Sequence, residues 1–205
     1  GAAEAKADGI LFQIIDLDSY IIPTDQDYAE IKECYLNQED WSVLIDRANS
    51  LGLDVWINVY DMESARFCKN QKAKGYKLHA ANLENEKLVR EVVKAGKEIA
   101  ISAGGMEEDE LDKVLQLVYS VDKRADIHLM YGLQNFPTNP EGINLYFVKE
   151  LSEKYGVHFG YQDHSEPTSD ASTFLPVLFI ASGASIIEKH ITHDRSLKGE
   201  DMKRP

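Results

Sequence analysis

The chain has 205 residues, of which 43% are hydrophobic and 28% charged, with a formal net charge of -13 and a pI near 4.9. This composition predicts a globular protein with room for one substantial core. The acidic balance argues against a nucleic-acid or anionic-membrane surface, because phosphate groups repel such a field. We therefore expect no nucleic acid and no membrane among its partners.

The two cysteines, Cys34 and Cys68, lie far apart and form no metal-binding or redox motif. They are interpreted as ordinary buried or half-buried thiols of a reducing compartment. No apolar run reaches the length of a bilayer span, and the start "GAAEAKADG" lacks the apolar core of a signal peptide. These features predict a cytoplasmic protein.

Short apolar runs rich in β-branched residues alternate with longer stretches of helical spacing along the whole chain. Strands are predicted over residues 9–15, 53–60, 75–81, 97–103, 126–132, 157–163 and 184–191. Helices are predicted between them over residues 38–52, 62–75, 85–97, 106–124, 143–156 and 169–183. A glycine follows most of these helical patterns, where a left-handed cap is expected: Gly52, Gly75, Gly96, Gly156 and Gly183.

Strands that are each followed by a helix predict right-handed βαβ units and a parallel sheet. No Gly-rich dinucleotide fingerprint is present, which favours an α/β fold of the (β/α)8 TIM-barrel type over a doubly wound sheet. The chain opens on the alanine-rich "AAEAKADG" and shows seven strand patterns. We therefore expect residues 1–205 to be a single (β/α)-barrel domain, an excerpt of a longer protein, that lacks the first strand.

In such a barrel the chemistry lies at the carboxyl ends of the strands. This rule selects polar and aromatic residues that end successive predicted strands: Gln13, Asp16, Asn58, Tyr60, Lys77, His79, Ser102, Tyr131, Gln134, Asp163, His164, Glu188 and His190. His164 and His190 occupy equivalent strand ends, each near an acid. Neutral imidazole with carboxylate or water suits zinc, manganese or iron, so they are either metal ligands or structural histidines. Alternation along the last strand places Glu188 and His190 on one face and Lys189 on the other.

Lys77 interrupts an otherwise apolar strand, and a buried lysine must find an anion or lose its proton. It is a candidate for phosphate or carboxylate binding, for a Schiff base, or for snorkelling to the rim. The turn Ser102-Ala103-Gly104-Gly105 either offers backbone N–H groups to an anion or uses small residues for close packing. Both interpretations stay open on the residues alone.

The stretch "YQDHSEPTSDASTFLPVLFIASGASIIEKHITHDRSLKGED" resembles the closing barrel segment of the sialic acid synthase family, above all in E-K-H-x-T-x-D-R-x-x-x-G-x-D. The pieces "LFQ", "YKLHAANL", "AISAGGM" and "NFPTNPEGINL" resemble other segments of that family in the same order. The resemblance covers nearly the whole chain. It implies a TIM-barrel enzyme that condenses phosphoenolpyruvate with an N-acetylated amino-sugar aldehyde into a nine-carbon 2-keto sugar acid.

The resemblance also implies roles for individual residues. His164 and His190 would hold the divalent metal, typically manganese, with magnesium or cobalt as alternatives. Lys77 and Ser102 would bind phosphoenolpyruvate, and Glu188 would transfer a proton. The residues around the sugar would be Gln13, Tyr60, Phe136, Glu188 and Asp201. The family implies a homodimer whose small C-terminal antifreeze-like domain would follow Pro205.

This chain departs from the family pattern at several positions, some of which touch the phosphate in the family: Leu11, Asn58, Ala80, Gln134, Gln162 and Met202. Asn58 and Gln134 remain candidate substrate-binding residues. Three hypotheses follow: a divergent synthase, a non-catalytic or repurposed relative that has lost phosphoenolpyruvate binding, and a Schiff-base or metal-dependent aldolase. The lost cation and hydroxyls favour the second hypothesis, and the closing motif favours the first.

Overall fold

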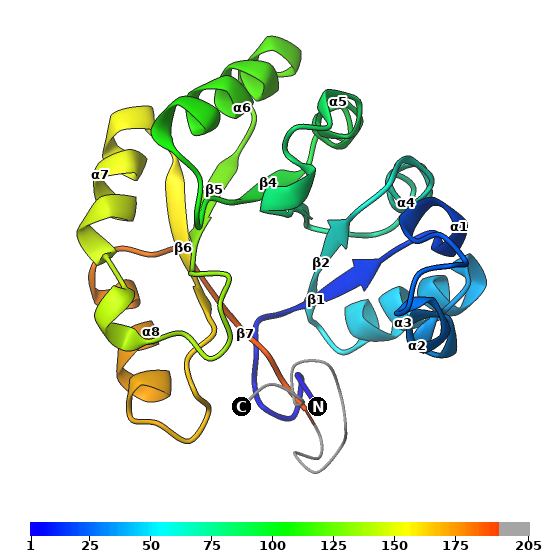
Figure 1. The fold of residues 1–205 in the computed structure, drawn as a ribbon, viewed down its shortest axis with the longest axis horizontal. Coiled ribbons are helices and arrows are strands. Elements are labelled where there is room, and N and C mark those ends of the chain that lie inside the picture. Colours follow the sequence, from blue (N-terminus) through cyan, green and yellow to red (C-terminus); the bar gives the residue numbers. More distant parts are fainter. Residues whose placement is uncertain (193–205) are drawn as a thin grey trace. The chain divides into compact units, whose positions relative to one another are not determined.

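The described residues of the computed structural model, 1–192, form two compact units (Figure 1). The amino-terminal unit contains residues 2–99 and 109–126, and the carboxy-terminal unit contains residue 1 and, among the described residues, 100–108 and 127–192. Hydrogen bonding orders the seven strands of the sheet as they occur in the chain, from β1 to β7. The fold is therefore α/β, with strands and helices in alternation.

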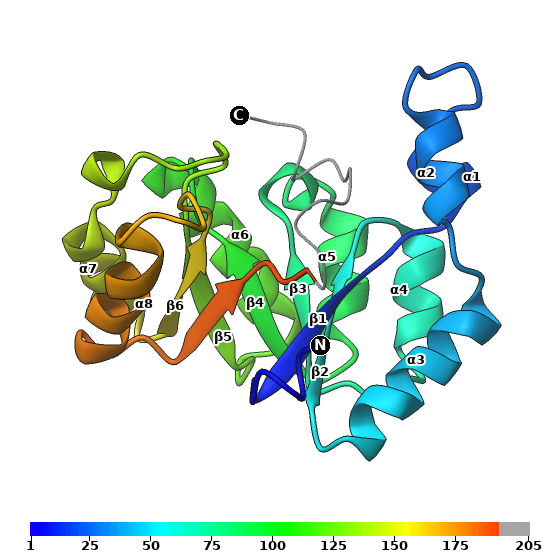
Figure 2. The same cartoon turned by 90° about the horizontal axis from the view of Figure 1, so that it is seen from below.

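The elements that begin the chain belong to the amino-terminal unit. They are β1 (Gly9–Ile14), α1 (Leu17–Tyr20), α2 (Tyr28–Cys34), α3 (Gln38–Ser50), β2 (Asp54–Val59), α4 (Met62–Cys68), β3 (Gly75–Leu78), a 3-10 turn (Ala80–Asn82), α5 (Glu86–Val93), the start of β4 (Glu98–Ser102) and nearly all of α6 (Glu108–Val121). β2 pairs in parallel with both β1 and β3. Both α3 and α4 lie along the same side of β1 and β2 (Figure 2).

Side-chain alternation decides which face of β1 meets the helices. The ring of Phe12 lies 5.5 Å from the ring of Trp41 on α3, so Phe12 faces the helix layer. Its neighbour Gln13 therefore points to the opposite face, because successive strand residues alternate. Ile45 and Ala48 of α3 are buried, as the helical spacing predicts.

The carboxy-terminal unit holds the remaining elements: β5 (Ile127–Tyr131), a 3-10 turn (Pro140–Gly142), α7 (Leu145–Tyr155), β6 (His158–Asp163), α8 (Ala171–Ala181) and β7 (Ile186–Lys189). β6 pairs in parallel with β5 and β7, and α7 and α8 flank it on one side (Figure 1). The core of the unit consists of Tyr131, Val148, Phe159, Tyr161, Ala171, Leu175 and Phe179. Tyr161 and Phe179 stack with their rings 4.1 Å apart, which fixes Tyr161 on the helix side of β6.

The predicted α/β alternation is confirmed, since all seven strands and the six predicted helices are present in order. The closed eight-stranded barrel stays a prediction. Two short helices, α1 and α2, were not predicted. The left-handed backbone predicted after helices is confirmed at Gly52, Gly96, Gly156 and Gly183.

The prediction for Gly75 is wrong, because this residue opens β3 instead of capping a helix in the left-handed conformation. Glycine is needed there for space. A Cβ at Gly75 would lie 2.4 Å from the Trp56 ring and 2.7 Å from the Glu98 carbonyl oxygen. Glycine is thus required at position 75 by the close packing of β3 against Trp56 and Glu98, and not by a helix cap.

Within residues 1–192, no helix combines the length and the apolar character that crossing a bilayer requires.

The two cysteines are both free thiols in different environments, and this difference predicts their reactivity. The predicted burial is confirmed for Cys68 and wrong for Cys34, which is exposed. Burial, helped by the charge of Asp61, raises the pKa of the Cys68 thiol from 9.0 to about 12.

At pH 8 only about one Cys68 thiol in ten thousand would then be a thiolate. We expect iodoacetamide to alkylate Cys34 alone in the folded protein and both thiols in urea, as read by mass spectrometry. Rapid labelling of native Cys68 would contradict this.

Candidate active site

Three polar residues form a row across the strand ends of the amino-terminal unit. Gln13 pairs in register with Asn58, and Asn58 pairs with Lys77. Residues in register on parallel strands project to the same face, and Gln13 points away from the helices. Asn58 and Lys77 are buried, with 1% and 5% of their surface exposed. The row therefore places one cation and two amides side by side at the predicted end of the strands.

Asn58 is the residue of this row whose buried side chain has an incomplete set of hydrogen bonds. Its Nδ2 donates to the Tyr60 hydroxyl at 2.9 Å, while its buried Oδ1 accepts no hydrogen bond from residues 1–192. A buried acceptor without a donor costs about 1–3 kcal/mol, so such groups normally pair with the protein, an ordered water or a ligand. The Tyr60 ring lies 5.5 Å from Tyr20 and 6.0 Å from His79, which adds an aromatic wall.

Two residues selected by the strand-end rule cap short helical segments. Asp16 accepts a hydrogen bond from the Ser19 amide and caps α1, and its own amide donates to Asp61. His79 Nδ1 accepts from the Ala81 amide at the start of the 3-10 turn. These contacts give both residues a structural role, because a capping side chain satisfies an otherwise orphaned N–H group.

A second polar row lies in the carboxy-terminal unit. Gln162 pairs in register with Glu188, and its Nε2 donates to the Ser102 hydroxyl at 3.0 Å. Gln162 and Ser102 are 2% and 0% exposed. Because Tyr161 faces the helices, alternation sends Gln162 and Glu188 to the other face, as predicted for Glu188. The Ser102 hydroxyl therefore accepts a hydrogen bond from Gln162.

His164 and His190 come together, as the sequence predicts, beside Phe136. The two imidazole rings lie 5.4 Å apart and nearly perpendicular, at 86°. The Phe136 ring lies 5.7 Å from His164 and 5.5 Å from His190. Gln134, also a predicted site residue, belongs to the same loop and is exposed. The three rings thus form one compact group within the carboxy-terminal unit.

The hydrogen bond made by His164 fits a metal ligand. Its Nδ1 lies 2.7 Å from the Leu133 carbonyl oxygen, and a carbonyl can only accept. Nδ1 therefore carries the proton, and Nε2 keeps its lone pair when the ring is neutral. Metal-binding histidines commonly donate their second ring N–H to a carbonyl or carboxylate in this way. The chemistry of the residues present thus suits a divalent ion at His164 and His190.

The Asp163 carboxylate connects the segments that carry these histidines. Its Oδ2 accepts from Lys189 Nζ at 2.5 Å, and its Oδ1 accepts from the Ser165 amide at 3.0 Å and the Tyr161 hydroxyl at 3.2 Å, as well as from the Ser165 hydroxyl. Burial raises the pKa of Asp163, but the bonds from Lys189 and Ser165 outweigh burial and lower it overall. Lys189 Nζ also donates to the Ser172 carbonyl oxygen of α8, so Lys189 faces the helix layer, opposite Glu188 as the alternation predicts.

The turn after β4 is built on close backbone packing. A Cβ on Gly104 would lie 1.8 Å from the Gly132 carbonyl oxygen, and a Cβ on Gly132 would lie 2.4 Å from that of Gln162. The packing interpretation of this turn, left open by the sequence, therefore holds for Gly104. The absence of a side chain at Gly104 lets the backbone after Ser102 pack against the ends of β5 and β6.

This packing predicts a strong effect of a single methyl group. Gly104→Ala should destabilise the protein by about 1–3 kcal/mol, because the added carbon overlaps backbone that cannot move aside. Gly142→Ala is the matched control, since its Cβ would meet only the end of the Leu133 side chain at 3.1 Å. Urea unfolding of both variants measures the difference. Equal midpoints for Gly104→Ala and the wild type would contradict the account.

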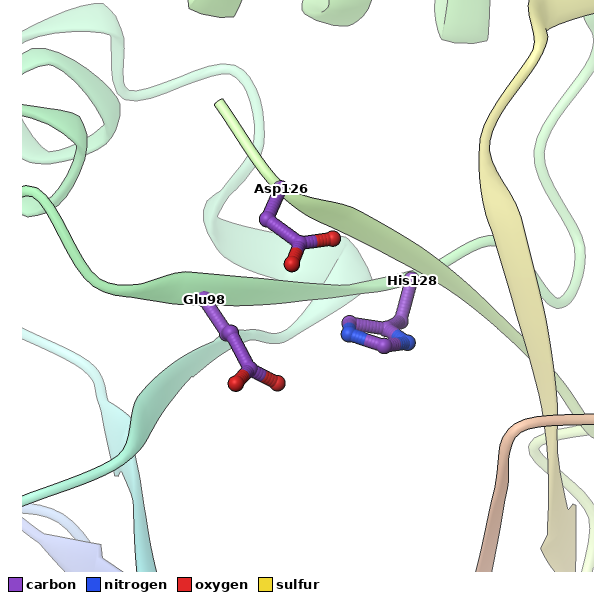
Figure 3. Close-up of side chains that lie close together, drawn as sticks. All are labelled: Glu98, Asp126 and His128. Atoms are coloured by element: carbon purple, nitrogen blue, oxygen red, sulfur yellow. The ribbon is translucent and has the colours of Figure 1, made fainter. Parts of the chain in front are cut away.

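A further group of potential metal ligands was missed by the strand-end rule. Among residues 1–192 it contains Glu98, Asp126 and His128 (Figure 3). Glu98 begins β4 and Asp126 immediately precedes β5, so they lie at the opposite strand ends from the predicted site. The signal in the sequence is the pair Asp126 and His128, which alternation places on one strand face.

Predicted residue Asp201 lies outside the described residues.

Comparison with known proteins places these residues in a family context. The NeuB family model matches residues 1–204. Pseudaminic acid synthase of Campylobacter jejuni is 28% identical over 98% of this chain and 61% of its own length. N,N'-diacetyllegionaminic acid synthase of Legionella pneumophila is 26% identical, over 98% of this chain and 60% of its own length. The chain thus spans about three fifths of the length of these two relatives.

A solved structure shows the same similarity in three dimensions. The N-acetylneuraminic acid (sialic acid) synthetase of Leptospira borgpetersenii, crystallised with citrate, superposes with a TM-score of 0.86 at 25% identity. The match covers 98% of this chain and 68% of that one.

Proposed function

The chain belongs to the NeuB family, and on that premise we propose that it condenses phosphoenolpyruvate with an N-acetylated amino-sugar aldehyde to give a nine-carbon 2-keto sugar acid. Relatives that are pseudaminic and legionaminic acid synthases support a sugar-acid synthase. One observation carries the proposal: His164, His190 and Phe136 form a ring group with His164 oriented through Nδ1. That orientation supports the proposal, because it leaves the His164 Nε2 lone pair available to a metal ion when the ring is neutral.

The proposed reaction forms one carbon–carbon bond. C3 of phosphoenolpyruvate joins the aldehyde carbon, the aldehyde oxygen takes a proton, water adds at C2, and phosphate leaves. A divalent ion, manganese by family resemblance with magnesium or cobalt as alternatives, would be held by His164 and His190 and would supply Lewis-acid polarisation of the aldehyde.

The remaining roles fall to the chain's own side chains. Lys77 supplies a cation for the phosphate or carboxylate of phosphoenolpyruvate, and the Ser102 hydroxyl donates a hydrogen bond to it. Glu188 moves a proton at the reacting atoms, because its carboxylate shares a strand face with His190. The Oδ1 atom of Asn58 accepts a hydrogen bond from a substrate hydroxyl or amide.

The amino sugar is assigned to a mainly uncharged set of side chains. These are Gln13, Tyr60, Gln134, Phe136 and Asp201. Aromatic and amide groups suit a sugar that carries an acetamido group, because they combine apolar contact with directional hydrogen bonds. The family pattern also places Glu188 around the sugar, so Glu188 contacts the sugar as well as transferring the proton.

The wider setting is also part of the proposal. The domain closes into an eight-stranded (β/α)-barrel and works as a homodimer in the cytoplasm. The family resemblance supports the barrel and the dimer, and the free thiols of Cys34 and Cys68 support a reducing compartment.

A second candidate function follows from the contact between Gln162 and Ser102. The Gln162 amide occupies an acceptor site on Ser102, and Gln162 stands where the family has a serine. Such a change favours a repurposed relative that retains the metal and sugar residues but no longer binds phosphoenolpyruvate. The two candidates differ in whether phosphate is released.

The experiment measures phosphate released from phosphoenolpyruvate across a panel of N-acetylated amino sugars with manganese present. The proposal predicts release that depends on both the sugar and the metal. If the folded protein binds manganese but releases no phosphate with any sugar in the panel, the synthase proposal fails and the repurposed relative is favoured. Omitting the sugar is the control for unproductive hydrolysis.

A further inference from the structure

The two histidines proposed as metal ligands each follow a residue of one ion pair. Asp163 immediately precedes His164, and Lys189 immediately precedes His190. Asp163 and Lys189 are register partners across β6 and β7, and their side chains meet at 2.5 Å. The ion pair lies on the helix face of these strands, behind the face that carries the histidines.

The Asp163 carboxylate of this ion pair also holds the backbone around His164. Asp163 Oδ1 accepts from the amide of Ser165, the residue after His164. The backbone on either side of His164 is therefore held by one carboxylate. The Thr138 amide also donates to the His164 carbonyl oxygen at 2.7 Å. These contacts leave the His164 backbone little freedom to move relative to the end of β6.

The same carboxylate holds the strand that carries His190. Lys189 Nζ bridges Asp163 Oδ2 and the Ser172 carbonyl oxygen of α8, each at 2.5 Å. The Asp163 side chain is 2% exposed and that of Lys189 42%. Loss of the lysine charge would leave a buried carboxylate short of a partner, whereas exposed ion pairs usually contribute little.

We propose that the Asp163–Lys189 ion pair is a positioning device that sets the spacing of His164 and His190 for a shared divalent ion. The inference rests on the proposed function, because it takes the histidines as ligands. A metal site tolerates little displacement of its ligands, and loss of outer groups that orient them typically weakens metal binding about 10- to 100-fold. Asp163 and Lys189 thus act through the histidines without contacting the ion.

The test measures Mn²⁺ affinity by electron paramagnetic resonance and the visible spectrum of bound Co²⁺ in the full chain. Lys189→Met should weaken Mn²⁺ binding about 10- to 100-fold and alter the Co²⁺ spectrum. Lys189→Arg keeps the charge and should retain the wild-type Mn²⁺ affinity and Co²⁺ spectrum. Lys74→Met is the matched control, because Lys74 pairs with Asp54 at 2.7 Å on an exposed surface, and it should bind Mn²⁺ like the wild type.

Each other outcome has a definite meaning. Wild-type affinity and spectrum in Lys189→Met would overturn the positioning role while leaving the metal site intact. Should that variant fail to fold, Asp163→Asn, which keeps the shape and the acceptor oxygen, takes its place, and wild-type Mn²⁺ affinity there would equally overturn the proposal. If Mn²⁺ binding is unchanged in a His164→Ala/His190→Ala double variant, the proposed metal site itself is wrong.

Discussion

Replacement of either His164 or His190 by alanine should remove tight Mn²⁺ binding and lower kcat/KM by about 1000-fold or more, since metal polarisation contributes several kcal/mol to such reactions. The expected effect is large because the two rings, 5.4 Å apart, are the nitrogen donors assigned to the ion. Isothermal titration with Mn²⁺ and steady-state kinetics measure the two losses separately.

His158→Ala serves as the control for this prediction. His158 is an exposed histidine at the start of β6, at the other end of the strand that leads to His164. Its replacement should leave Mn²⁺ affinity and kcat/KM near wild type. Full activity in the His164→Ala variant, or a loss of equal size in His158→Ala, would rule out the assigned ligand pair.

Replacement of Lys77 by methionine should raise the KM for phosphoenolpyruvate about 10- to 100-fold, the equivalent of one lost charge-assisted hydrogen bond or two. The chain should stay folded, because methionine fills the same buried space without a charge. Lys77→Arg should keep part of the affinity. Steady-state kinetics that vary each substrate in turn show whether the effect is confined to phosphoenolpyruvate.

The same lysine separates the synthase from a Schiff-base aldolase. Borohydride added with pyruvate should leave Lys77 unmodified in the wild type if the lysine binds the anion without forming an imine. A reduced adduct at Lys77, found by peptide mass spectrometry, would instead support the aldolase. Lys69→Met, which removes an exposed partner of Glu91, is the control for the kinetics of Lys77→Met. It should leave the KM for phosphoenolpyruvate unchanged.

Much of the fold could be predicted because strands and helices leave strong periodic patterns. Runs such as residues 99–101 are apolar on both faces, as parallel strands between helices require. The helices α1 and α2 escaped prediction for a physical reason: α1 spans four residues, and α2 buries none of its side chains. Without an apolar stripe, a short helix gives no periodic signal.

The site could be predicted in outline but not in its supporting contacts. Alternation was sufficient to place Glu188 opposite Lys189, and the strand-end rule found both histidines. The rule could not separate candidate ligands from helix-capping residues, so Asp16 and His79 were included. Nor could it find the contact of Gln162 with Ser102, because a hydrogen bond between residues 60 positions apart depends on sheet register.

The proposed activity joins phosphoenolpyruvate to an amino-sugar aldehyde. It is tested most directly with phosphoenolpyruvate labelled with carbon-13 at all three carbons, an N-acetylated amino sugar and Mn²⁺, followed by mass spectrometry of the products. A synthase should form a nine-carbon 2-keto acid that carries all three labelled carbons, with one phosphate released per molecule formed. Labelled phosphoenolpyruvate that stays intact, or label that appears only as pyruvate, would contradict it.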